Sequence, residues 1–147
     1  MQKLRRWMKV VGSLFVLNGV LLIVSYYVRP IGEASGEERV PGADLTSPLY
    51  DFAMETWLMF GLEMLVVGGS LWFFSRAPWA SRALVLTVLA LEVVRGIIDD
   101  ISWIVNGYPP GFYVGWIVFH IVVIVTGVRA LQAAQVEADE RSIVPVG

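Results

Sequence analysis

Residues 82–103 read RALVLTVLALEVVRGIIDDISW, and the rest of the chain is arranged around this stretch. It has the apolar character of a helix that crosses a lipid bilayer, but four charged residues interrupt it: Glu92, Arg95, Asp99 and Asp100. At about 100° per residue, the spacing predicts one helical face made of Glu92, Arg95, Asp99 and Trp103. A charge at bilayer depth is costly unless it finds a partner or water. This face is therefore expected to turn inward, toward other parts of the chain or a partner.

The composition of the whole chain also indicates a membrane protein. Of its 147 residues, 56% are hydrophobic and 16% are charged, and the mean hydropathy is +0.67. A soluble domain carries about 25% charged residues. The net charge of -2 and the lack of a basic block with interleaved aromatic residues argue against a nucleic-acid partner. The absence of cysteine excludes disulfides, thiolate catalysis and cysteine-ligated metals.

Four apolar runs are long enough to span a hydrocarbon core of about 30 Å, near residues 8–28, 52–74, 83–105 and 112–131. The first run could be a signal peptide, but bulky residues stand where a small-residue cleavage site is needed, so a retained span is favoured. The short connections at 75–82 and 106–111 predict antiparallel neighbours. The predicted fold is all-α: a single domain over 1–147, built as an integral membrane four-helix antiparallel bundle.

Basic residues predict the orientation of this bundle. Eight of the eleven Lys and Arg residues lie at one end of the predicted spans, two lie at the other end, and Arg95 lies inside. The positive-inside rule then puts both termini in the cytoplasm. It makes 29–50 an outer loop, either simply solvated or a lid over an outward opening, and 132–147 a cytoplasmic tail that continues as a helix before its end frays.

Superposing the spans by depth predicts a layer of polar and aromatic side chains near the bilayer midplane and on its outer side. Its members are Asn18, Glu55, Glu63, Glu92, Arg95, Asp99, Asp100, Trp103, Trp116 and His120. One interpretation is a ligand pocket that opens outward. The other is a purely structural network, in which Glu92 pairs with Arg95 and Glu63 with His120. In either case the Arg95 guanidinium is predicted to contact Glu63, Glu92 or Asp99.

Several kinds of site are not expected. No spacing of histidines and carboxylates suits a metal, no glycine-rich loop suits a phosphate, and no nucleophile has a matched base. No cofactor is therefore predicted.

Five short motifs carry a family resemblance: Trp7-Met8-x-x-x-Gly12, Leu62-Glu63, Ser75-Arg76-x-Pro78, Glu92-x-x-Arg95-Gly96-Ile97-x-x-Asp100 and Trp116-Ile117-x-x-x-His120. Together they resemble the BphX-like family of small bacterial integral membrane proteins over about residues 3–131, and the chain is more loosely similar to DoxX-type four-helix membrane proteins. The resemblance implies a multi-pass protein of the bacterial inner membrane. Family members are encoded among genes for aromatic-compound degradation, and the resemblance supplies no catalytic residues and no substrate.

Three functions are compatible with these observations. The first is a membrane protein that binds a small hydrophobic or aromatic molecule at the polar layer. The second is a structural subunit, either in a homo-oligomer or with another membrane protein. The third is an intramembrane acid–base isomerase of a lipid-like substrate, with glutamate and histidine exchanging protons.

Overall fold

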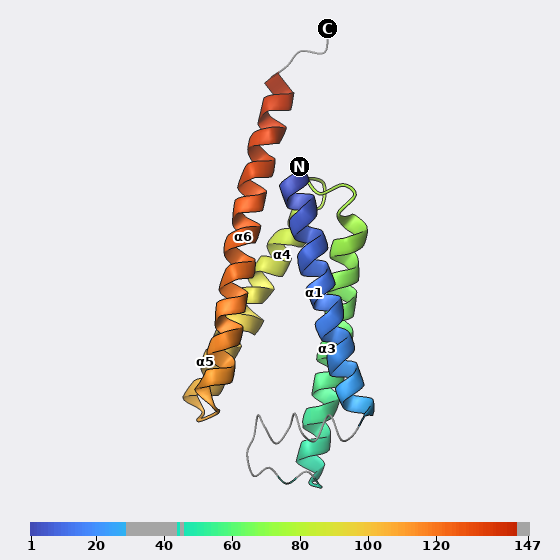
Figure 1. The fold of residues 1–147 in the computed structure, drawn as a ribbon, viewed down its shortest axis with the longest axis vertical. Helices are drawn as coiled ribbons and strands as arrows, with labels where there is room; N and C mark the ends of the chain where they lie inside the picture. Colours follow the sequence, from blue (N-terminus) through green and yellow to red (C-terminus); the bar gives the residue numbers. More distant parts are fainter. Residues whose placement is uncertain (29–43, 45, 144–147) are drawn as a thin grey trace. The chain divides into compact units, whose positions relative to one another are not determined.

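The computed structural model describes residues 1–28, 44 and 46–143, and these residues form helices and turns without a strand (Figure 1). The elements in chain order are α1 (Gln2–Tyr27), α3 (Pro48–Phe74), α4 (Arg82–Leu91), the π-helix η1 (Glu92–Ile98), α5 (Asp99–Val105) and α6 (Pro110–Ile143). Most of the predicted outer loop 29–50 and the last residues of the predicted tail lie outside the described residues.

Each predicted span corresponds to helical structure. The helices α1, α3 and α6 are each long and apolar enough to cross a membrane. The third predicted span, 83–105, is one uninterrupted helical segment in which α4, η1 and α5 follow one another without a break. We call this segment, Arg82–Val105, the composite helix. The predicted helical continuation beyond Arg129 is also present, since α6 extends to Ile143.

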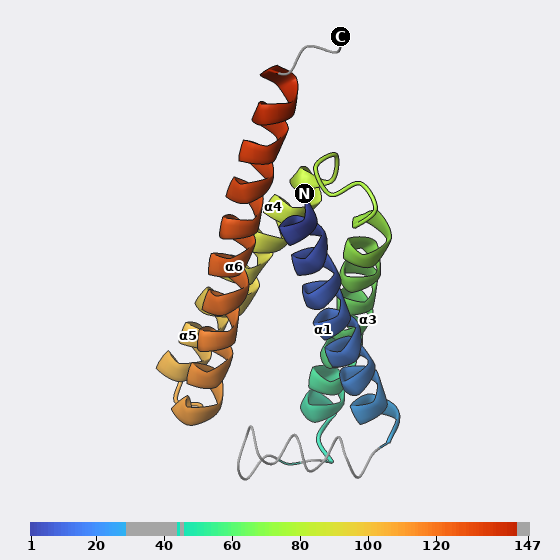
Figure 2. The ribbon, with the colours of Figure 1, turned by 45° about the horizontal axis from the view of Figure 1, so that its top comes forward.

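The chain divides into two compact units, and the helices α1 and α3 each contribute to both. The first unit contains Met1–Gly12 and Ser70–Gly147, and the second contains Ser13–Gly69. In the first unit α6 packs along the composite helix, as both ribbon views show (Figure 2). Apolar side chains fill the core of this unit: Leu4, Met8, Leu71, Val85, Val88, Leu89, Val123, Ala130 and Ala134.

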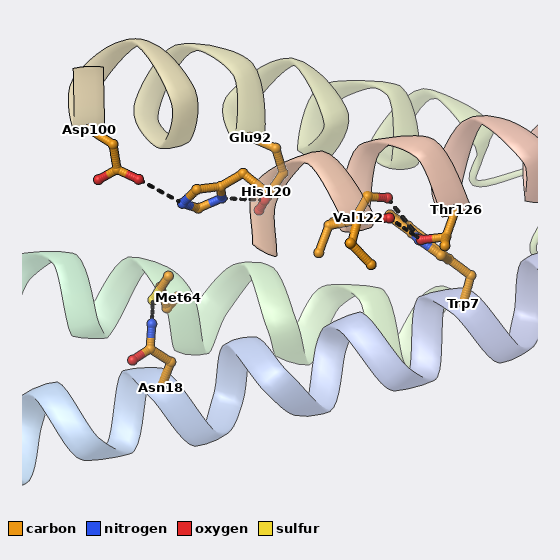
Figure 3. Close-up of polar contacts among 9 residues, drawn as sticks. Trp7, Asn18, Met64, Glu92, Asp100, His120, Val122 and Thr126 are labelled. Carbon is orange, nitrogen blue, oxygen red and sulfur yellow. Dashed lines mark hydrogen bonds and ion pairs between the residues drawn. The ribbon is translucent and has the colours of Figure 1, made fainter. Parts of the chain in front are cut away.

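Trp7 attaches the start of α1 to α6 within the first unit. Its indole Nε1–H lies 3.3 Å from the carbonyl oxygen of Val123 and 3.2 Å from Oγ1 of Thr126, and it donates to both (Figure 3). The Trp7 ring also lies against Gly127, where an added Cβ would come within 3.0 Å of the ring. An indole needs such a partner when it is buried, so these bonds fix the depth of the first residues of α1 along α6.

Local sequence explains where the composite helix ends and where α6 begins. Gly107 has a φ of 90°, a left-handed conformation that glycine adopts without penalty. Its N–H donates to the carbonyl of Ile104, and the N–H of Tyr108 donates to the carbonyl of Trp103. This is the Schellman pattern, which satisfies two carbonyls at a helix end. Pro110 then opens α6, where the missing N–H of proline costs nothing.

In the second unit α1 and α3 cross at two glycines. A Cβ on Gly19 would lie 2.6 Å from the carbonyl oxygen of Gly61, so the two backbones approach more closely than any side chain would allow. One helical position away, the Asn18 side-chain amide donates to Sδ of Met64 at 3.3 Å. Close approach of this kind is how helices associate where lipid removes the hydrophobic driving force.

Candidate functional site

The imidazole of His120, on α6, lies between two carboxyl groups of the composite helix (Figure 3). Its Nδ1 is 2.7 Å from Oε2 of Glu92, a distance typical of a hydrogen bond to a carboxylate. Its Nε2 is 3.6 Å from Oδ2 of Asp100, within ion-pair range but too long for a hydrogen bond. Both ring nitrogens of one histidine are thus directed at acids.

This histidine site is largely removed from solvent. Glu92 is 4% exposed, and the side chains of His120 and Asp100 are 13% and 14% exposed. Among the described residues, Oδ2 of Asp100 is buried without a hydrogen bond. Two carboxyl groups and one imidazole therefore lie close together in a region that is largely screened from solvent.

The π-helix decides which acids face His120. In a continuous α-helix residues seven apart share a face, because seven steps of about 100° differ from two full turns by only about 20°. A π-helical turn accommodates one extra residue, so the partner of Glu92 on this face becomes Asp100 and not Asp99. Glu92 and Gly96 are buried, whereas Arg95 and Asp99 are exposed. The predicted face of Glu92, Arg95, Asp99 and Trp103 is therefore wrong, because the composite helix does not keep one period.

Gly96 makes room for the histidine. A Cβ at this position would lie 2.5 Å from both Cγ and Nδ1 of His120. The imidazole thus rests on bare backbone midway between the two acids. Any larger residue at position 96 would push the ring away from Glu92.

Aromatic rings continue from the histidine site along α6. The ring centroids of Trp116 and Phe119 lie 6.0 Å and 5.6 Å from that of His120. Trp116 is followed toward the start of α6 by Phe112 and Tyr113, and Tyr113 stacks on Trp103 at 6.4 Å. We call the five rings of Trp103, Phe112, Tyr113, Trp116 and Phe119 the aromatic row.

The histidine site suits proton transfer and contact with apolar groups better than metal binding. Glu92, Asp100 and His120 can hold or pass a proton, and the aromatic row offers flat apolar surface next to them. A metal centre is not indicated, because no group of three or more His, Asp or Glu side chains within the described ranges could hold an ion.

Comparison with known proteins identifies the family. The chain matches the BphX-like family over residues 1–136. The chain belongs to the BphX-like family. It is 25% identical over 135 residues to two relatives, the "Uncharacterized BphX-like protein" of Burkholderia cepacia and the "Uncharacterized BphX-like protein Bxeno_C1129" of Paraburkholderia xenovorans strain LB400. Each match covers 90% of this chain and 94% of the relative. No solved structure matches the chain.

Four of the predicted site residues come together in this BphX-like protein: Glu92, Asp100, Trp116 and His120. Trp103 belongs to the far end of the aromatic row. His120 pairs with Glu92, and the predicted pairing of His120 with Glu63 stays a prediction. Glu55, Glu63 and Asn18 belong to the second unit, so their place beside His120 stays a prediction. The predicted contact of Arg95 with Glu63, Glu92 or Asp99 also stays a prediction.

Sequence reasoning gave no structural role to Gly96 or Phe119. A signal for Gly96 was present, because a residue without a side chain stands four positions from each of Glu92 and Asp100. The π-turn had only a weak signal. Gly96 and the β-branched residues around it lower the preference for a regular α-helix but do not specify a wider turn.

Proposed function

We propose that this BphX-like protein is a four-span protein of the bacterial inner membrane with both termini in the cytoplasm. Three helices have the length and apolar character for this, and the composite helix is also long enough for a core of about 30 Å. The eight-to-two distribution of Lys and Arg supports the orientation. The lipid bilayer is then its principal environment.

We further propose that the protein binds a small hydrophobic, aromatic molecule beside His120. One observation carries this proposal: the largely buried imidazole, held between two acids, adjoins the rings of Trp116 and Phe119. Sites for small ligands combine mostly apolar walls with a few fixed polar groups. The polar groups would orient the molecule, and the rings would supply contact area.

Ligand-dependent thermal stability tests this proposal. The full chain in lipid nanodiscs would be melted with naphthalene, phenol or benzoate, with cyclohexane as a non-aromatic comparison. A stabilising shift with an aromatic probe, lost in Trp116→Leu and His120→Gln but kept in Trp79→Leu, would support the site. Equal shifts in all four proteins, or none with any aromatic probe, would refute it.

A subunit of a larger membrane assembly is the second candidate, and the surface of the composite helix favours it. Asp99 is exposed, although a charge at bilayer depth faces protein or water in preference to lipid. A second copy of the chain or another membrane protein could cover it. Mass measurement of the detergent-solubilised protein separates the cases, since a monomer that still shows the probe-dependent shift would exclude an obligate homo-oligomer.

A further inference from the structure

Asp99 and Asp100 are consecutive acids in the composite helix, and the form of that helix decides which of them faces His120. In the structure Asp100 faces the ring, Asp99 is exposed, and the π-helix between Glu92 and Ile98 accounts for the choice. If the same residues formed a continuous α-helix with Glu92 in place, Asp99 would lie within about 20° of Glu92, and Asp100 would lie about 80° away. The acid next to the ring would then be Asp99.

Gly96 would remain on the histidine-facing side in both forms. In a continuous α-helix it lies about 40° from Glu92, close to the position that it has beside the ring in the structure. Gly96 therefore still lies under the imidazole after the change. The Glu92–His120 bond does not have to break when the form of the helix changes.

In the π form of the composite helix, and among the residues that the structure describes, one carboxyl oxygen of Asp100 lacks the hydrogen bond that a buried acid normally makes. Asp100 is 3.6 Å from the imidazole, and its buried Oδ2 has no hydrogen bond within the described part of the chain. At the end of the π-segment the Asp99 N–H donates to the carbonyl of Gly96, three residues back, so the π-helical hydrogen-bonding pattern stops at this residue.

We propose that Asp99 is an alternate second carboxylate of the histidine site, exchanged with Asp100 when the composite helix passes from its π form to a continuous α form. The exchange turns α5 by about one residue, or about 100°, so that Ser102 replaces Trp103 opposite Tyr113. Trp103 is the last ring of the aromatic row. The row therefore becomes shorter when Asp99 replaces Asp100 beside His120. This proposal rests on the Glu92–His120 contact and does not require that any ligand binds.

Thermal stability of three variants gives the first test, since asparagine keeps the size of aspartate and removes its charge. Asp99→Asn should melt within about 1 °C of the native chain, and Asp100→Asn should melt about 3 °C lower because Asp99 can replace the lost acid. The Asp99→Asn/Asp100→Asn protein should lose clearly more than the two single losses combined. In a His120→Gln background this excess should disappear. Additive losses, or an excess that persists without His120, would overturn the proposal.

Cross-linking gives the second test, which remains readable if a variant is unstable. The native chain has no cysteine, so introduced pairs are unique. A short bifunctional thiol reagent should join the Trp103→Cys/Tyr113→Cys pair faster than the Ser102→Cys/Tyr113→Cys pair, because Trp103 and Tyr113 are stacked. Adding Asp100→Asn should reverse this order, and adding Asp99→Asn should not. An unchanged order in the Asp100→Asn background would show that Asp99 does not exchange.

Discussion

Nδ1 of His120 and Oε2 of Glu92 lie 2.7 Å apart and join α6 to the first residue of the π-helix, across 28 positions of the sequence. The contact holds a nearly buried acid against a single imidazole. It therefore determines the register in which α6 lies along the composite helix, and with it the positions of Asp100 and Trp116.

Removing His120 should strongly destabilise the protein. His120→Ala leaves Glu92 buried without its partner, which costs about 3–5 kcal/mol for a broken buried pair. Unfolding by sodium dodecyl sulfate titration, followed by tryptophan fluorescence, would measure the loss. The paired variant Glu92→Gln/His120→Gln should lose markedly less, because two neutral amides can bond to each other. An equal loss in both proteins would show that the ion pair is not the source of the effect.

Gly96→Ala should also destabilise the protein, because the new methyl would lie 2.5 Å from the His120 ring. Overpacking of this kind costs about 1–3 kcal/mol, more than the gain of at most about 1 kcal/mol from replacing a helical glycine. Gly115→Ala in α6 is the matched control, since nothing lies within 4 Å of its added Cβ, and it should be neutral or stabilising. Adding Gly96→Ala to His120→Ala should cause little further loss, because the ring that the methyl would meet is then gone; full additivity would mean that the methyl clashes with something else.

Trp7→Phe should lower the free energy of unfolding by about 1 kcal/mol, since phenylalanine keeps most of the ring packing but cannot donate the indole hydrogen bonds to α6. Thr126→Val should have a smaller effect, because the carbonyl of Val123 still accepts from Trp7. Chemical unfolding of both variants in the same detergent makes the comparison. The opposite order would indicate that the hydroxyl of Thr126 is the principal acceptor.

Gly19→Ala should weaken the crossing of α1 and α3, because its methyl would lie 2.6 Å from a carbonyl oxygen of Gly61, and backbone cannot move aside as a flexible side chain can. A loss of about 1–3 kcal/mol is expected. Gly69→Ala on α3 meets nothing within 4 Å and serves as the control. Protease sensitivity in the segment between the two helices should rise in Gly19→Ala alone; a matching rise in Gly69→Ala would point to a general effect of alanine.

Reporter fusions should show both termini in the cytoplasm and residues 32–48 outside. The excess of Lys and Arg at one end of the spans gives the expectation. Alkaline phosphatase should be active after fusion within 32–48 and inactive at the C-terminus, and a fluorescent protein should behave in the opposite way. Phosphatase activity at the C-terminus would reverse the predicted topology.

Local sequence predicted the four helical segments and several of their ends, although α1 begins at Gln2 and not at residue 8. Long apolar runs can satisfy their backbone only as helices in lipid, so 52–74 and 83–105 agree closely with α3 (Pro48–Phe74) and the composite helix (Arg82–Val105). Gly107 and Pro110 marked the turn before α6, because each residue has a conformational preference of its own. The charged and aromatic residues within the apolar run at 83–105 also identified the stretch that carries two acids of the site.

Which of those residues meet depends on how α6 packs against the composite helix. A sequence predicts a helical face by assuming one angle per residue, and the π-turn between Glu92 and Ile98 breaks that assumption by one position. The local preference of this segment does not demand a wider turn. The packing of α6 supplies the reason, because the imidazole of His120 lies on Gly96 and bonds to Glu92. Asp100 therefore reached the site and Asp99 did not, through a contact between residues far apart in the chain that no local pattern records.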